Sequence, residues 1–186
     1  MSAELYSQTN NSRTGYTNLQ NISVGNISCT TVLSTGLISS KTFFLDGQNS
    51  VAQVIPNATN TAIAFDTVNI SNNFPLPTAG NTKFTIPQVG WWQVTSSVTW
   101  NTGAGTLRIL YLRVNGNNNL RYGQQIVPPV SGDNTAGASI SPAVFFNGTS
   151  DYFEIIAYQD SGGNLNSGDT APSALINRIG VTYLHQ

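Results

Sequence analysis

Apolar and polar residues alternate most clearly in residues 90–100, GWWQVTSSVTW. Because side chains along a strand point alternately to the two faces of a sheet, this pattern predicts a β-strand with one buried face. Trp92, Val94, Val98 and Trp100 fall on the buried face, whereas Trp91 falls on the polar face. Trp91 therefore covers a sheet edge, contacts a subunit or ligand, or is exposed to solvent.

Two other segments are apolar on both faces, residues 107–114 (LRILYLRV) and residues 152–158 (YFEIIAY). In a two-layer sandwich the outer face of each sheet meets water, so these strands need a second cover. Burying an apolar side chain against another subunit stabilises the assembly by about 1.5–3 kcal/mol. A handful of such contacts outweighs the cost of association, and the pattern favours an oligomer.

From Thr61 to the end of the chain, short apolar stretches alternate with clusters of Gly, Asn, Pro and Ser. No stretch of useful length has helical periodicity. Many short strands separated by turns predict an all-β sandwich or barrel, and we assign it to residues 61–186.

The preceding residues divide into two parts. Residues 1–18 have almost no apolar content and are expected to form a flexible tail. Residues 19–60 are predicted to be a β-rich, stalk-like segment that ends in a connector. Within it, residues 21–40 repeat every five positions (NISVG, NISCT, TVLST, GLISS), with Ile22, Ile27, Val32 and Leu37 in second place. This period fits a β-solenoid rung or an intertwined fibrous stalk, and the alternative is one or two plain strands.

Charge is scarce, because Asp, Glu, Lys and Arg make up 8% of the chain, against roughly 25% in average soluble proteins. Asn, Ser, Thr and Gly supply the polarity, as is typical of turn-rich β-proteins. A net charge of −1 without basic clusters argues against nucleic acid and anionic membranes as partners. No apolar run is long enough to span a bilayer, and the first residues lack a secretion signal pattern.

Residues 64–100 resemble the opening half of the complement C1q globular head, in the C1q/tumour necrosis factor (TNF)-like superfamily. The residues that carry the resemblance are Phe65, Asn69, Phe74, Phe84, Pro87, Gly90 and Trp92. Later in the chain, residues 112–116 (LRVNG), 147–162 (NGTSDYFEIIAYQDSG) and 179–184 (IGVTYL) are similar to family strands. The chain departs from the pattern where Ser150 replaces a usual glycine and where Ile179, Val94 and Ser96 replace common aromatic residues, and three extra residues precede Phe84.

The resemblance implies a ten-stranded jelly-roll sandwich that forms a homotrimer, with the five-residue repeat in place of a stalk. It makes Phe65, Phe74, Phe84, Gly90 and Trp92 the core motif. Trp91 and Phe145 become candidate subunit or ligand contacts, because each lies on the opposite face from its neighbour, Trp92 or Phe146.

Groups suited to catalysis are few. The single histidine, His185, is the penultimate residue, and Cys29 lies in the repeat without a nearby base. Asp151 and Glu154 are expected to cap or solvate a strand. Residues 160–169 (DSGGNLNSGD) could hold Ca²⁺, but they lack the dense carboxylates of a dedicated site, so a solvated loop is expected. We therefore expect no enzyme, no cofactor and no metal.

The leading hypothesis is a structural and recognition protein, a trimeric head on a virion surface or capsid that mediates attachment or particle assembly. The resemblance is strongest to fibre, spike or decoration proteins of large DNA viruses and phages. The expected partners are further copies of the chain and either capsid proteins or a host receptor or glycan, at the virion surface or outside the cell. The alternatives are a soluble cytokine-like or lectin-like trimeric module and a bacterial spore-surface protein.

Overall fold

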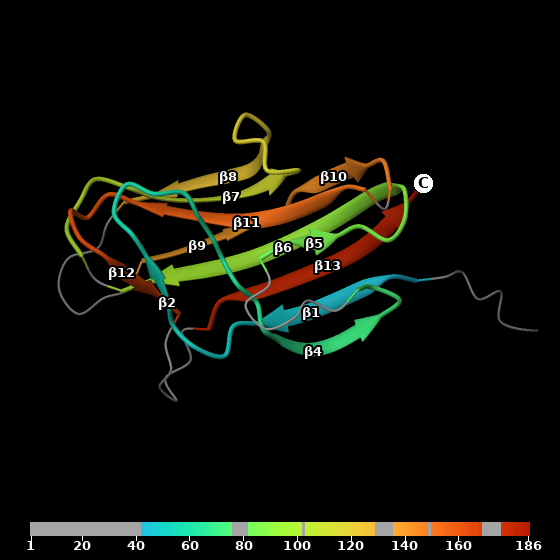
Figure 1. The fold of residues 1–186 in the computed structure, drawn as a ribbon, viewed down its shortest axis with the longest axis horizontal. Helices are drawn as coiled ribbons and strands as arrows, with labels where there is room; N and C mark the ends of the chain where they lie inside the picture. The colour runs from blue at the N-terminus through green and yellow to red at the C-terminus, as the bar shows by residue number, and fades with distance from the viewer. Residues whose placement is uncertain (1–41, 76–81, 102, 129–135, 149, 169–175) are drawn as a thin grey trace, which may run out of the picture. The chain divides into compact units, whose positions relative to one another are not determined.

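The computed structural model describes residues 42–186 except 76–81, 102, 129–135, 149 and 169–175 (Figure 1). The predicted tail and five-residue repeat lie outside the described residues. What is described falls within one compact unit, Ser40–Gln186, and contains strands but no helix. No described segment is therefore a helix that could cross a membrane.

The described residues form thirteen strands. These are β1 (Phe44–Gln48), β2 (Gln53–Ile55), β3 (Thr61–Ala62), β4 (Thr67–Asn72), β5 (Phe84–Thr85), β6 (Gly90–Trp100), β7 (Arg108–Val114), β8 (Arg121–Val127), β9 (Ala136–Ile140), β10 (Ala143–Phe146), β11 (Tyr152–Gln159), β12 (Leu165–Ser167) and β13 (Arg178–His185).

The strands make two antiparallel sheets. The larger sheet has eight strands in the order β2-β12-β6-β13-β1-β4, and β9 and β10 also pair with β6. The smaller sheet has five strands in the order β3-β11-β7-β8, and β5 also pairs with β11 (Figure 1). Buried side chains from both sheets form one hydrophobic core, so the two sheets pack face to face.

Strand β6 confirms the predicted alternation. Trp92, Val94, Val98 and Trp100 are completely buried, and Trp91 is 40% exposed. β6 pairs with β13 along most of its length, which places its buried face over the core.

Aromatic rings fill one end of this core. The Trp92 ring meets Phe74 edge to face with centroids 5.6 Å apart, and Tyr183 lies 5.1 Å away. Phe84 stacks on Phe153 at 5.1 Å and tilts against Phe65. The structure thus places the four aromatic residues of the predicted core motif inside the sandwich.

The sandwich begins earlier than the predicted boundary at Thr61. β1 pairs with β13 on one side and with β4 on the other, and β2 pairs with β12. Part of the predicted connector is therefore sheet. Asp46 and Gly47 lie within β1 because they pair in regular register with Gly180 and Ile179 of β13, while the register shift against β4 leaves Asn69 as the extra residue.

The described strands also outnumber the ten expected from the resemblance. One cause is the interruption between β9 and β10 at Ser141 and Pro142, although both strands pair with β6. Proline has no N–H to donate to a ladder, so the pairing breaks there. Another cause is that β3 and β5 are pieces of two residues each.

The two-sided strands, β7 and β11, are central in the smaller sheet, and part of their outward face is covered within the single chain. Tyr111 and Ile156 lie outside the shared core, opposite each other, and both are completely buried within the single chain. The Arg121 guanidinium lies 4.7 Å from the centre of the Tyr111 ring and covers part of it. The inference of an oligomer from these two strands is therefore wrong for Tyr111 and Ile156.

Candidate interaction surface

The outward face of the larger sheet carries an exposed aromatic pair. Trp91 on β6 and Phe145 on β10 lie directly opposite each other in the ladder, 40% and 45% exposed. Their rings meet edge to face, with centroids 5.7 Å apart and an interplanar angle of 66°. Aromatic cross-strand pairs of this kind hold each other in a fixed position. The two predicted contact candidates are therefore brought together.

The C-terminal end of β13 extends this apolar surface. His185 lies opposite Trp91, and Leu184 is 46% exposed. We call Trp91, Phe145 and Leu184 the apolar patch. Leu184 continues the alternation of β13, in which Ile179 and Val181 are buried and residues 178, 182 and 184 are exposed, but only the pairing of β13 with β6 brings it to the end of the strand that carries Trp91.

Gly90 allows β6 and β13 to approach at this point. Its φ is +140°, and a Cβ there would lie 2.6 Å from the backbone oxygen of His185 and 2.7 Å from the Tyr183 ring. A side chain at residue 90 would therefore push the end of β13 away from β6. This contact is a physical reason for glycine in the predicted core motif.

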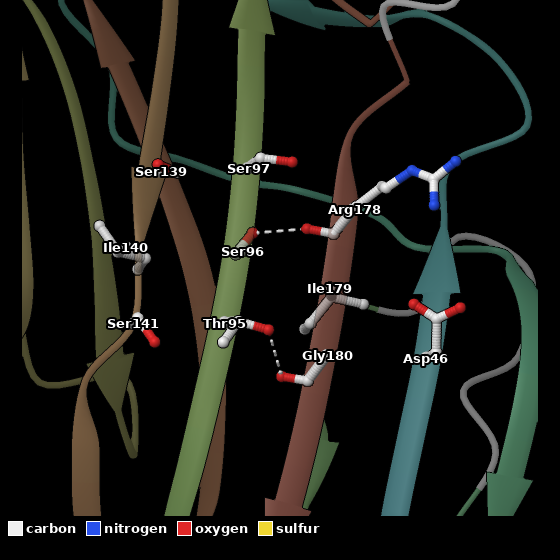
Figure 2. A pocket seen from close by; sticks show the side chains of 10 residues that line it. All are labelled: Asp46, Thr95, Ser96, Ser97, Ser139, Ile140, Ser141, Arg178, Ile179 and Gly180. Atoms are coloured by element: carbon white, nitrogen blue, oxygen red, sulfur yellow. Dashed lines mark hydrogen bonds between the residues drawn. The ribbon is translucent and has the colours of Figure 1, made fainter.

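A shallow depression of about 430 Å³ lies on the same outward face (Figure 2). Gly180 leaves room there, since a Cβ on it would lie 2.5 Å from Thr95 Oγ1. Hydroxyl groups line the depression together with one acid and one base, and the polar lining residues are Thr95, Ser96, Ser97, Ser139, Ser141, Asp46 and Arg178. The sequence did not predict this depression, because serine, threonine and glycine are common throughout this turn-rich chain and do not mark a particular site.

The hydrogen bonds in the depression are structural. Thr95 Oγ1 donates to the Gly180 carbonyl at 3.3 Å, and Ser96 Oγ donates to the Arg178 carbonyl at 2.9 Å (Figure 2). Asn69 Nδ2 donates to the Asp46 carboxylate at 2.9 Å. The depression presents hydrogen-bond donors and acceptors, groups that can bind a polar ligand or surface.

The two acids considered for catalysis are tied into the fold. Asp151 accepts hydrogen bonds from the Asn147 amide at 2.7 Å and from Asn115 Nδ2 at 2.9 Å. Glu154 is 4% exposed and pairs with Arg113 at 2.9 Å. His185 is exposed, and Cys29 lies outside the described residues. The described part of the chain contains no group of three or more His, Cys, Asp or Glu residues that could hold a metal ion.

The loop considered for Ca²⁺ uses its first carboxylate internally. Asp160 accepts hydrogen bonds from the backbone amides of Thr106 at 2.8 Å and Leu107 at 2.9 Å, and from the Thr106 hydroxyl. These bonds, with the nearby Arg108 charge, lower the pKa of Asp160 to about 2. Asp169, at the other end of the loop, is not among the described residues, so the expectation of a solvated loop stays a prediction.

Comparisons with known proteins agree with this architecture. No protein-family model and no curated protein sequence matches the chain. Among solved structures, Eiger TNF from S. frugiperda is similar with a TM-score of 0.55 and 13% identity, over 78% of this chain and 92% of that chain. Murine APRIL at pH 5.0 is similar with a TM-score of 0.51 and 14% identity, over 77% of this chain and 100% of that chain. At such identities the likeness shows the fold alone, and the fold is a TNF-like jelly roll.

Proposed function

We propose that the chain is a non-enzymatic recognition protein that assembles as a homotrimer through the outward face of the larger sheet. The observation that carries the proposal is the apolar patch, in which the paired rings of Trp91 and Phe145 are exposed and Leu184 is exposed on the adjacent strand β13. Covering such a patch with a second copy stabilises the assembly, because it removes apolar area from water.

The charge on this face supports self-association. The depression beside the apolar patch contains one acid, Asp46, and one base, Arg178, among hydroxyl groups. A face with so few charges can be covered without burying an unpaired ion, which would be costly. Hydroxyl groups can pair with each other or with trapped water at such a contact.

The setting we propose is a virion or similar particle, on which the trimer is the head of a fibre, spike or decoration protein. Residues 21–40 would form the stalk, and the partners would be capsid proteins or a host receptor or glycan. The supporting observations are the five-residue repeat and a low-charge chain rich in Asn, Ser, Thr and Gly. This setting puts the protein at a particle surface or outside the cell.

A second candidate is a soluble cytokine-like or lectin-like trimeric module that acts free of any particle. The observation that favours it is that the compared structures are a TNF and APRIL. Abundance in purified particles would support the first setting, and recovery only as a soluble extracellular factor would support the second.

The solution mass, measured by light scattering, tests the assembly. It should be measured on the full chain and on residues 40–186, because a chain that starts at Thr61 would lack β1 and β2. A trimer in both cases supports assembly through the sandwich. A trimer in the full chain alone assigns assembly to the repeat instead, and a monomer in both cases contradicts the proposal. The non-enzymatic assignment would be contradicted if the protein turned over a substrate and this activity disappeared when Asp151 or Glu154 was replaced.

A further inference from the structure

The outward face of the smaller sheet gathers cations over aromatic rings. Arg113 and Arg121 lie opposite each other on β7 and β8. The Arg121 guanidinium lies over Tyr111, and Lys83 Nζ lies 4.8 Å from the centre of the Tyr152 ring. We call Lys83, Arg113 and Arg121 the cationic face.

The charge of this face is opposite in sign to the net charge of the whole chain. Three of the five lysines and arginines in the described residues lie here, together with one carboxylate, Glu154, which lies opposite Arg113 on β11. Glu154 Oε2 is paired with Arg113 at 2.9 Å. The local excess is therefore positive, in a chain whose net charge is −1.

One turn residue holds both guanidinium groups in place. Arg113 Nη1 donates to Asn118 Oδ1 at 2.9 Å, and Arg121 Nε donates to the Asn118 carbonyl at 2.9 Å. Arg121 is exposed, and its bond to Asn118 uses only one of its five N–H groups. The guanidinium group is thus fixed in position with donors left for a ligand, which lowers the entropy lost on binding.

A row of apolar side chains lies next to the cations. Ile109 on β7 lies opposite Ile126 on β8 and opposite Tyr158 on β11. Directly paired residues share a face, so this row lies beside Tyr111 and the cationic face. Ile126 is 57% exposed. A ligand that fits the whole surface therefore combines negative charge with apolar groups.

We propose that this surface binds an acidic segment of a different polypeptide, in which aliphatic side chains stand near carboxylates. A polypeptide supplies both the carboxylates that suit arginine and the apolar groups that suit Ile109 and Ile126. A sulfated glycan would leave the apolar row in water. The proposal is independent of the proposed trimer, since it uses the other sheet.

Within residues 1–41 and the described residues, charge argues against two occupants drawn from this chain, namely its own N-terminal segment and a second copy. Residues 1–41 contain Glu4, Arg13 and Lys41, so this segment is not acidic. A second copy would have to offer free carboxylates, yet all five described acids already accept hydrogen bonds within the chain. These acids are Asp46, Asp66, Asp151, Glu154 and Asp160.

The test is fluorescence anisotropy with the full chain and a fluorescein-labelled peptide of repeating Glu-Glu-Leu units. The control peptide has Gln in place of every Glu. We expect binding of the acidic peptide that weakens with salt, and no binding of the Gln peptide. The variants Arg121→Gln and Lys83→Gln should each weaken binding, Arg121→Gln about tenfold, and Ile126→Ser should weaken it severalfold.

Val51→Ser is the matched control for Ile126→Ser, because Val51 is 58% exposed and lies just before β2 of the larger sheet, and its binding should equal that of the parent chain. No binding of the acidic peptide, equal binding of the Gln peptide, or no effect of the three variants would overturn the proposal. Binding of heparin in place of the peptide, lost in Arg121→Gln, would overturn the assignment to a polypeptide. Circular dichroism of each variant shows whether the fold is intact. The solution mass of each variant shows whether a loss of peptide binding occurs without a loss of self-association.

Discussion

Trp91 and Phe145 lie opposite each other on β6 and β10 with their rings 5.7 Å apart, while their chain neighbours Trp92 and Phe146 are completely buried. Two adjacent strands thus carry one aromatic pair into the core and another onto the surface. A strand pair needs only the buried side chains to hold the sandwich together. The exposed pair is therefore the part of this ladder available for a contact outside the subunit.

Replacing Trp91 with aspartate should weaken self-association and leave the β-fold intact, because a charge at a covered apolar patch must be desolvated. Light scattering should show a lower mass than for the parent chain, with unchanged circular dichroism. Leu120→Asp is the matched control, since Leu120 is 43% exposed but lies in the turn between β7 and β8. If Trp91→Asp keeps the parent mass, Trp91 is not in the interface.

Replacing Trp92 with alanine should lower the free energy of unfolding by about 3–5 kcal/mol, the usual cost of removing a buried large aromatic residue. The Trp92 ring contacts Phe43, Phe74 and Tyr183, and its Nε1 donates to the Gln88 carbonyl at 3.1 Å. Urea unfolding at a fixed protein concentration measures the change, since association also shifts apparent stability. Trp91→Ala should cost much less, and equal losses for the two tryptophans would contradict their placement.

The regular part of the fold could be predicted from the sequence, and the irregular parts could not. Strict alternation identified the buried face of β6, and ordered aromatic motifs identified a TNF-like sandwich. β1 was missed because Asp46 and Gly47 usually mark a turn, whereas pairing with β13 and β4 makes them part of a strand. The partner strands are distant in the sequence, and a local pattern does not contain them.

The candidate surfaces divide in the same way. Alternation separated Trp91 and Phe145 from the core, but the position of Leu184 near Trp91 depends on the pairing of β13 with β6, two segments that are far apart in the sequence. Two-sided apolar strands indicate that something covers both faces, without saying what. At Tyr111 the cover is Arg121 of the same chain, a contact between residues on different strands.

Replacing Asn177 with alanine should lower the free energy of unfolding by roughly 1–3 kcal/mol, the range for leaving buried polar groups unpaired. Asn177 is completely buried, its Nδ2 donates to Ser167 Oγ at 2.8 Å, and its Oδ1 accepts from the Thr99 backbone amide at 3.0 Å. Its side chain therefore joins the start of β13 to β12 and to β6. Thermal unfolding measures the loss. Asn166→Ala, at an exposed position on β12, should have little effect, and the same small effect for Asn177 would show that this network is dispensable.

Acid should destabilise the sandwich between about pH 4 and pH 2, and Asp160 should contribute to the loss. The Thr106 hydroxyl and the Leu107 and Thr106 amides lower the pKa of Asp160 from 3.8 to about 2. Burial acts to raise the pKa of Asp66, but hydrogen bonds from Ser50 outweigh it and lower that pKa as well. A carboxyl group with a lower pKa in the folded state takes up protons more readily when unfolded. Its contribution is therefore complete above its unfolded pKa and is lost as the pH falls through the folded value.

The urea midpoint of the parent chain should accordingly decline as the pH is lowered from 5 to 2, and Asp160→Asn should flatten this decline. Asn keeps an acceptor for the amides of residues 106 and 107 but removes the titrating group. Asp66→Asn should remove a further part of the pH dependence, because the two carboxylates belong to separate hydrogen-bond groups. If Asp160→Asn lowers the urea midpoint equally at every pH, Asp160 stabilises the loop only through its fit and its hydrogen bonds. The charge of Asp160, and with it the lowered pKa, would then not contribute to stability.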